Sequence, residues 1–205
     1  MNTKNKSIIL SLLILIFLMI TFLVVTNNTN VTNLDKVIYN FINTHQSSSV
    51  YNFLLSITKI GDVFESFIIF LIFGLFLMLK DKNNLYKFIQ TTFLGLALVE
   101  IIKYFIQRTR PVNPLELGLS FPSAHATLAT VFLLSSIFLL APLIKEKISK
   151  NIFLTATSII FPLIAFSRIY LSVHWTSDVV AGIILGSVCF IFSEIICCHK
   201  KENVL

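Results

Sequence analysis

The chain has 205 residues, of which 56% are hydrophobic and only 13% are charged. Soluble domains carry about a quarter charged residues, so this composition excludes an ordinary soluble protein and indicates a membrane protein. The formal net charge is +6, but the basic residues form short clusters between apolar runs and make no continuous face, so nucleic-acid binding is not predicted. The cysteines have neither metal-ligand spacing nor the pattern of a disulfide framework, and all fall in or beside the last apolar run, at Cys189, Cys197 and Cys198.

Six apolar runs are each close to the roughly 20 residues that a helix needs to cross the hydrocarbon core of a bilayer. They are predicted at residues 8–25, 63–79, 88–105, 123–144, 152–171 and 178–198. The first resembles a signal peptide, but it is long and has no small-x-small cleavage site, so we expect an uncleaved span. Residues 34–42 have apolar side chains at helical spacing on one face and are too short to cross, which predicts an interfacial helix. Residues 47–62 are also amphipathic.

These elements predict an all-α polytopic membrane protein with six transmembrane helices and an interfacial segment after the first. We expect one domain over residues 1–205, with no linker to a second. In the last span, Gly182 and Gly186 form a small-residue stripe that favours close helix packing. Glu194 in the same span has no evident partner in the sequence.

The lysines predict the orientation of the chain, because cytoplasmic loops carry an excess of basic residues. If both termini lie on one side, that side holds Lys4, Lys6, Lys80, Lys82, Lys87, Lys145, Lys147, Lys150, Lys200 and Lys201. The opposite side then holds the smaller set of Lys36, Lys59, Lys103, Arg108, Arg110 and Arg168. Both termini are therefore predicted to be cytoplasmic.

Three polar stretches lie beside the apolar runs, and the six-span topology places all three on the outer face. Charged groups cost about 2.5–3.5 kcal/mol each at mid-membrane on insertion scales, so they usually mark function. The first stretch holds Lys103, Arg110 and Pro111; the second holds Pro122, Ser123 and His125; the third holds Ser167, Arg168, His174 and Asp178.

The spacing within these stretches suggests their chemistry. Lys103 and Arg110 are seven residues apart and share one face for as long as the helix lasts. Ser123 heads an apolar run, where the free N–H groups of a helix start can cradle an anion. If the last span is helical from its start, Asp178 lies one turn from His174 and can accept one ring N–H. The other ring nitrogen then keeps a lone pair and can act as a nucleophile or a base.

Three cations gathered without matching acids predict an anion among them, and phosphate is well matched by the arginine fork. The acidic residues of this side, Asp35 and Asp62 among them, are too scattered for a carboxylate cage around a divalent metal. No metal or other cofactor is therefore predicted, and the cations are expected to neutralise charge as Mg²⁺ does elsewhere. Arg108 is interpreted as a surface anchor near the headgroups, and Glu100 as a structural partner of Lys103.

Together the stretches resemble the signature of the type 2 phosphatidic acid phosphatase family: Lys-x6-Arg-Pro, then Pro-Ser-Gly-His, then Ser-Arg-x5-His-x3-Asp. The order and spacing match within a motif core of about residues 103–182, with Ala124 where the pattern often has Gly. The six-span layout also resembles the bacterial integral-membrane members. Three spaced motifs in order are far more specific than any one of them.

The resemblance implies a role for each matched residue. His174 attacks phosphorus to form a phosphohistidine, and Asp178 orients His174 and stabilises its imidazolium. His125 protonates the leaving oxygen and then activates water. The implied phosphate-binding residues are Lys103, Arg110, Ser123 and Arg168.

The predicted function is removal of a terminal phosphate from a lipid in the membrane, without a metal. Undecaprenyl pyrophosphate is the first candidate, because an outward site suits recycling of a wall-lipid carrier; phosphatidylglycerophosphate and phosphatidate are the others. A phosphotransferase with a lipid or sugar acceptor and a phosphate-binding transporter are alternatives. Vanadate-binding peroxidases share the motifs but are large and soluble. The sequence predicts no oligomeric state.

Overall fold

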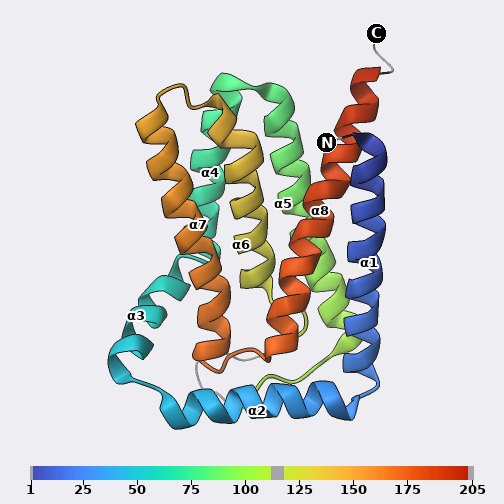
Figure 1. Ribbon diagram of the computed structural model, residues 1–205, viewed down its shortest axis with the longest axis vertical. Coiled ribbons are helices and arrows are strands. Elements are labelled where there is room, and N and C mark those ends of the chain that lie inside the picture. The colour runs from blue at the N-terminus through green and yellow to red at the C-terminus, as the bar shows by residue number, and fades with distance from the viewer. Residues whose placement is uncertain (1, 112–117, 203–205) are drawn as a thin grey trace.

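Six long helices run up and down in a bundle, and a seventh lies across one end of it (Figure 1). The computed structural model describes residues 2–111 and 118–202, with side chains as far as residue 197, so the side chains of Cys198, Lys200 and Lys201 lie outside the described part. The bundle comprises α1 (Thr3–Val25), α4 (Val63–Lys80), α5 (Lys82–Ile106), α6 (Ala124–Ser135), α7 (Lys147–Tyr170) and α8 (Thr176–Glu202). A π-helical turn (Ser136–Leu140) and a 3-10 turn (Ala141–Leu143) continue α6.

All six bundle helices are long and apolar enough to cross a membrane, which confirms the predicted spans. Where a polar residue caps a helix, that helix begins several residues before the apolar run that predicted it. Asn2 accepts from the backbone N–H of Lys4 at the start of α1, and Asp81 accepts from the N–H groups of Asn83 and Asn84 at the start of α5. Capping satisfies N–H groups that the first turn leaves unpaired, so helices extend into polar sequence.

The predicted interfacial helix is α2 (Thr29–His45), which crosses the end of the bundle opposite both termini, and α3 (Ser48–Lys59) leads from it back to α4 (Figure 1). Asn28 caps α2, and its side chain accepts from the N–H of Asn30. The helix is therefore longer than the apolar stripe of residues 34–42 that predicted it.

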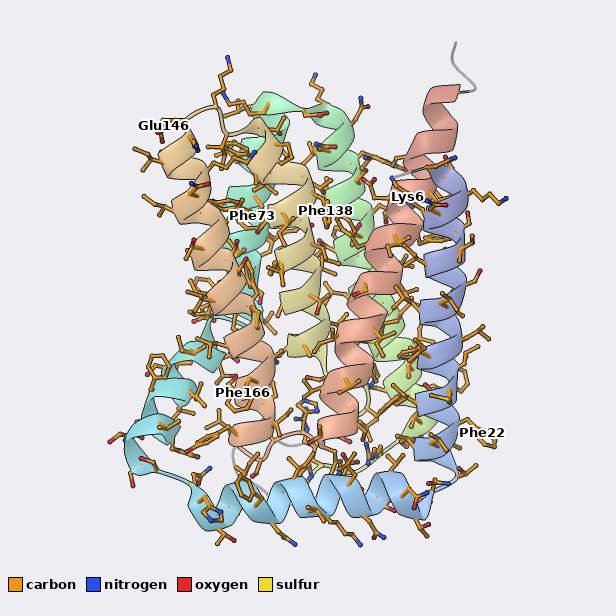
Figure 2. The ribbon with its side chains drawn as sticks, in the orientation of Figure 1. Lys6, Phe22, Phe73, Phe138, Glu146 and Phe166 are labelled. Carbon is orange, nitrogen blue, oxygen red and sulfur yellow. The ribbon has the colours of Figure 1, made fainter. Side chains whose placement is uncertain are left out.

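α6 lies at the centre of the bundle and α1 at its edge. In the most apolar stretch of each span, 56% of the residues are buried for the span that contains α6 and 6% for α1. The outer surface is apolar, and Phe22 and Phe166 point away from the bundle (Figure 2). Such a surface suits hydrocarbon, and the helices are held together by packing rather than by exclusion of water.

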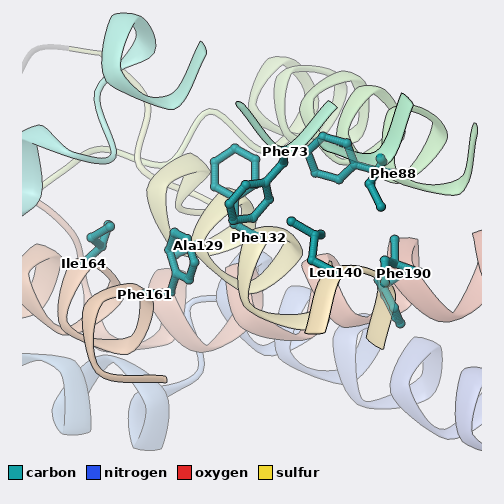
Figure 3. Close-up of a cluster of buried hydrophobic side chains, with 10 residues drawn as sticks. Phe73, Phe88, Ala129, Phe132, Leu140, Phe161, Ile164 and Phe190 are labelled. Carbon is teal, nitrogen blue, oxygen red and sulfur yellow. The ribbon is translucent and has the colours of Figure 1, made fainter. Parts of the chain in front are cut away.

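Aromatic rings from five helices, α4 to α8, contribute to the core (Figure 3). Phe73 of α4 lies 5.9 Å from both Phe88 of α5 and Phe132 of α6, measured between ring centroids. Phe132 lies 5.8 Å from Phe161 of α7. Aromatic pairs at this spacing contribute about 0.5–1.5 kcal/mol each beyond their buried area.

Glu194, which had no partner in the sequence, lies between two lysines. Its carboxylate is 2.6 Å from the Nζ atom of Lys6 and 2.6 Å from that of Lys87. The ion pairs tie α8 to α1 and α5 near the end of the bundle that carries the termini (Figure 2). The partners are 188 and 107 residues away in the chain, which hid them from pattern analysis.

The predicted close packing at Gly182 and Gly186 is present where α8 crosses α6. A Cβ atom on Gly182 would lie 2.6 Å from the backbone oxygen of Ser123, and one on Gly186 would lie 2.7 Å from that of Thr127. Because the obstructing atoms are backbone, α8 can approach this closely only with glycine at both positions.

Replacing Gly182 by Ala should therefore separate α8 from the start of α6. Overpacking of this kind costs about 1–3 kcal/mol, so we expect a lower melting temperature in detergent. Gly74→Ala is the matched control, because its added Cβ would meet only a Leu85 methyl group at an ordinary 3.9 Å. Equal melting temperatures for the two variants would contradict the tight α6–α8 contact.

Candidate active site

The three polar stretches meet at the end of the bundle that α2 crosses (Figure 1). α5 ends at Ile106, and Gln107 adopts a left-handed conformation with φ of 51° that turns the chain out of the helix. The helix thus ends before Arg110, and the expectation that Lys103 and Arg110 share a helical face is wrong. The terminating residue is Gln107, four positions before Pro111.

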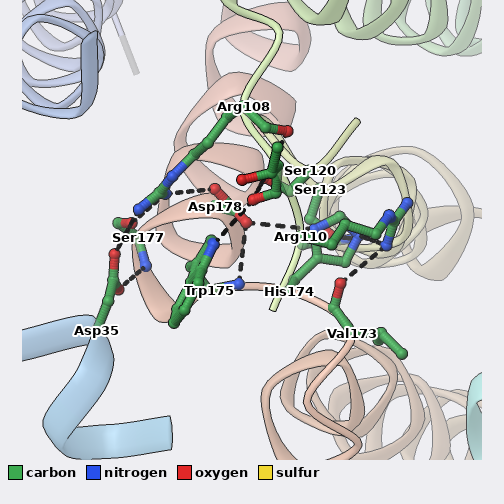
Figure 4. Close-up of polar contacts among 12 residues, drawn as sticks. Asp35, Arg108, Arg110, Ser120, Ser123, Val173, His174, Trp175, Ser177 and Asp178 are labelled. Carbon is green, nitrogen blue, oxygen red and sulfur yellow. Dashed lines mark hydrogen bonds and ion pairs between the residues drawn. The ribbon is translucent and has the colours of Figure 1, made fainter. Parts of the chain in front are cut away.

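Beyond α5 the backbone is extended, and Thr109 forms an isolated antiparallel bridge with Leu119. Side chains two residues apart in an extended chain point the same way. Arg108 and Arg110 therefore both reach the turn between α7 and α8, where His174 lies (Figure 4). Once the helix is known to end before Arg108, the Arg-x-Arg spacing itself indicates this convergence.

His174 lies in the short turn before α8 rather than in the helix, so His174 and Asp178 do not share a helical face. The turn is held by the backbone N–H of His174, which donates to the oxygen of Arg168 at 3.1 Å. The His174 side chain is buried, and its Nδ1 atom lies 3.5 Å from Oδ2 of Asp178. That is an ion-pair distance slightly longer than a hydrogen bond.

The other ring nitrogen of His174 faces a cation. Nε2 lies 3.0 Å from the NH1 group of Arg110, which also donates to the backbone oxygen of Val173 at 2.9 Å (Figure 4). A guanidinium group can only donate, so Nε2 must be the acceptor and the ring proton belongs on Nδ1. The geometry therefore assigns the lone pair to Nε2 and directs Nδ1–H toward Asp178.

Burial lowers the pKa of His174 below that of an ordinary histidine. The neighbouring Asp178 carboxylate opposes this shift, whereas the positive charges of Arg110 and Arg168 add to it. The imidazole is thus neutral at neutral pH, the form that a nucleophile or base requires.

Asp178 is completely buried, in the first turn of α8. Its Oδ2 accepts from the backbone N–H of Trp175 at 2.9 Å, and its Oδ1 accepts from Arg108 at 2.6 Å. Arg108 is also 2.7 Å from Asp35 of α2. The interpretation of Arg108 as a surface anchor is therefore wrong: its guanidinium is an internal partner of two buried carboxylates, because the extended chain turns it inward.

His125 lies in the first turn of α6, and its Nε2 is 3.0 Å from Oδ1 of Asp62, at the start of α4. Gly61 allows this approach, since a Cβ there would lie 2.5 Å from Cδ2 of the His125 ring. Sequence analysis missed Asp62 as a site residue because 63 residues separate it from His125.

Ser123 caps α6, as predicted, with its Oγ accepting from the N–H of Ala126 at 3.4 Å. Its own N–H donates to the backbone oxygen of Asp178 at 3.1 Å, which joins the second polar stretch to the third. Ala124 is the first helical residue of α6 and is not among the described residues with positive φ. Alanine is therefore unstrained at this position.

Arg168 and Lys103 have different surroundings. Arg168, in the last turn of α7, is 1% exposed and donates from NH1 to Oγ1 of Thr58 at 2.6 Å, so α3 forms one wall of the site. Lys103 pairs with Glu100 at 3.0 Å, as expected. Within the described residues, Lys103 forms no hydrogen bond or ion pair with the other predicted site residues.

The described part of the chain contains no group of three or more His, Cys, Asp or Glu side chains that could hold a metal ion. The acids of the site, Asp35, Asp62 and Asp178, each pair with an arginine or a histidine instead.

The family model described as the PAP2 superfamily matches residues 84–201, which is more than half of the chain and includes all three polar stretches. The chain belongs to the PAP2 superfamily. Its membership agrees with the resemblance drawn from the three motifs, and the family match includes every site residue except Asp35 and Asp62 and the residues of α3.

Relatives of this PAP2 chain include phosphatidylglycerophosphatase B of Bacillus subtilis, 37% identical over 45% of this chain and 48% of the relative. Decaprenylphosphoryl-5-phosphoribose phosphatase of Mycobacterium tuberculosis is 34% identical over 46% of this chain and 51% of the relative. The chain spans about half the length of these curated relatives. Undecaprenyl-diphosphatase of Sulfolobus acidocaldarius is 25% identical over 73% and 72% of the two chains.

Two solved structures share the PAP2 fold of this chain. A transmembrane PAP2-type phosphatidylglycerolphosphate phosphatase from Bacillus subtilis superposes with a TM-score of 0.79 at 24% identity, over 96% of this chain and 97% of that one. LpxE of Aquifex aeolicus gives a TM-score of 0.60 at 24% identity, over 76% and 92%. This chain is accordingly a multi-pass membrane protein.

The surroundings of His174 predict how its ring titrates. In NMR of ¹³C-histidine-labelled protein, assigned with His174→Gln, we expect its midpoint below the ordinary value of 6.5. Asp178→Asn should move that midpoint lower still, because it removes the carboxylate that favours the imidazolium. A midpoint above 6.5, or an upward shift in Asp178→Asn, would contradict the described environment.

Proposed function

We propose that this PAP2 chain hydrolyses a terminal phosphate from a lipid phosphate or pyrophosphate through a phosphohistidine on His174. One observation carries the proposal: the lone pair of Nε2 faces a guanidinium group inside a buried, cation-rich turn. A phosphate drawn to Arg110 and Arg168 would lie next to that nitrogen. The relatives named above are phosphatases of lipid phosphates or diphosphates, which supports this substrate class.

In the first step, Nε2 of His174 attacks phosphorus, an N–P bond forms and the P–O bond to the lipid breaks. His125 gives its proton to the departing oxygen, and Asp178 offsets the positive charge that develops on the His174 ring. In the second step, His125 takes a proton from water, whose oxygen attacks phosphorus. The N–P bond breaks, inorganic phosphate leaves and both histidines return to their starting forms.

The phosphate-binding residues of this proposal are those of the three motifs. Arg110, Arg168 and the start of α6 at Ser123 would hold the non-bridging oxygens. Lys103 is the fourth proposed phosphate-binding residue, and its ammonium group must leave Glu100 in order to contact the phosphate. His125 pairs with Asp62, and a carboxylate partner suits the protonated ring that a proton donor needs.

An apolar cavity beside the site supports a lipid substrate. It has a volume of about 250 Å³ and is lined from α4, α5 and α6. Val63, one of its lining residues, follows Asp62 directly, and Leu128 lies one turn beyond His125 on α6. A hydrocarbon chain lying there would place its headgroup near His125. Undecaprenyl pyrophosphate is the first candidate, before phosphatidylglycerophosphate and phosphatidate.

The site lies at the end of the bundle opposite both termini (Figure 1). The larger set of lysines lies toward the termini, so in this proposal both termini are cytoplasmic and the active site faces outward. An outward site suits a phosphatase that recycles a wall-lipid carrier.

Purified full-length protein in detergent should release phosphate from at least one of the three lipids. His174→Ala should reduce release by roughly 10³-fold or more, because the nucleophile is lost. His45→Ala is the matched control, since His45 is exposed on α2 and its ring lies against Phe41 of the same helix. Release from none of the lipids would favour a phosphate-binding transporter, and release that persisted in His174→Ala would remove its role as nucleophile.

The cations of the site replace a metal in this proposal, so EDTA should leave the rate of phosphate release unchanged. The measurement is the rate after dialysis against EDTA, with and without added Mg²⁺. A large loss that Mg²⁺ restores would show that the metal-free mechanism is wrong.

A further inference from the structure

A buried row of alternating charges runs from α2 to the nucleophile (Figure 4). Asp35 pairs with Arg108, Arg108 with Asp178, and Asp178 faces His174. Both carboxylates are at most 3% exposed and the Arg108 side chain is 14% exposed, so solvent screens the row little.

Arg108 holds both carboxylates at once. Its NH1 group donates to Oδ1 of Asp178 at 2.6 Å and to Oγ of Ser177 at 2.7 Å, and its NH2 group donates to Oδ2 of Asp35 at 2.7 Å. The guanidinium carbon lies 5.7 Å from the centre of the Trp175 ring. The planar fork fits this arrangement, which a lysine could not reproduce.

Asp35 in turn fixes the start of α8. Its Oδ1 accepts from the backbone N–H of Ser177 at 2.9 Å, and its Oδ2 accepts from the Ser177 hydroxyl at 2.6 Å. A carboxylate at the positive end of a helix is favourable. The same contacts orient the turn of α8 that carries Asp178.

The charges of this row must balance for His174 to react. A fully buried Asp178 needs a cation to stay ionised, because desolvating an unpaired carboxylate costs several kcal/mol. Arg108 supplies that cation, yet an unopposed Arg108 would weaken the hold of Asp178 on the ring. Asp35 offsets this charge. The other charged groups facing His174 are Arg110, from the extended segment, and Arg168, from α7.

We propose that Arg108 and Asp35 are positioning residues of the reaction, which hold Asp178 ionised and aimed at Nδ1 of His174 while the phosphohistidine forms. The inference rests on the proposed function. The ring becomes positive as the N–P bond forms, and the 3.5 Å gap between Nδ1 and Oδ2 is expected to close at that moment. Neither residue touches the phosphate.

The row makes an electrostatic prediction that a purely structural role does not share. Asp35→Asn keeps an oxygen for Ser177 but leaves the charge of Arg108 balanced by Asp178 alone, so the titration midpoint of His174 should fall. Arg108→Gln removes the cation that keeps Asp178 ionised, so the midpoint should fall toward that of Asp178→Asn. The double variant should have the midpoint of Arg108→Gln, because Asp178 is neutral in both. We expect kcat to fall about 10- to 100-fold in each single variant, as for other partners that orient a histidine, with KM within about twofold.

Lys36→Gln is the matched control, because it changes the charge of the neighbouring residue on α2 without touching the row; its midpoint and kcat should equal those of wild type. Melting temperatures in detergent accompany each measurement. If Arg108→Gln does not fold, Arg108→Lys takes its place: it keeps the charge and loses the fork, so kcat should fall with little shift of the midpoint.

Three outcomes would overturn the inference. A lower melting temperature with unchanged midpoints would make the row a tether for α2 alone. A large rise in KM with kcat retained would make Arg108 a phosphate ligand. A midpoint that rises in either single variant would exclude the charge row. If wild-type protein releases no phosphate, the proposed function fails, and the NMR midpoints still test the row by themselves.

Discussion

The constraint on which this structure depends is the cost of charge beside hydrocarbon. An ion isolated in a medium of low polarity is strongly destabilised, so each buried charge must have a partner. Asp35, Arg108, Asp178 and Arg168 are all well shielded from solvent, and each has a polar partner on another element. The pairings link α2 to α8 through the segment after α5, and α7 to α3, at one end of the bundle. The residues proposed to act in the reaction are therefore also residues that fix the local fold.

Side-chain packing and close backbone contacts also fix the positions of the helices. The aromatic core joins α4, α5, α6, α7 and α8, and glycines bring α8 against the first turns of α6. Because Ser123 donates to the backbone of Asp178, the start of α6 is joined directly to the start of α8, which follows the turn that carries His174. Because Gly61 has no side chain, the turn between α3 and α4 can pack directly against the His125 ring. Close backbone contacts thus set the distances among groups that come from five separate segments.

The sequence was sufficient for the spans, for the interfacial helix and for the grouping of the three motifs, because hydropathy and motif spacing are local properties. It was insufficient where partners are far apart in the chain. Glu194, Asp35 and Asp62 each found a partner more than 60 residues away. The helix end at Gln107 was also missed, since a left-handed glutamine has no sequence signature as strong as glycine. That single residue decides where both arginines point.

The position of Asp35 has a consequence for how the protein is made. It enters the membrane surface early, on the first interfacial helix, but the residues that neutralise and bind it come 73 and 142 positions later. An amphipathic helix at the interface keeps such a carboxylate in contact with water until its partners have been synthesised. The contacts of α2 with α8 can therefore form only after the start of α8 has been synthesised. The candidate site at this end of the bundle is one of the last parts of the nascent chain to be completed.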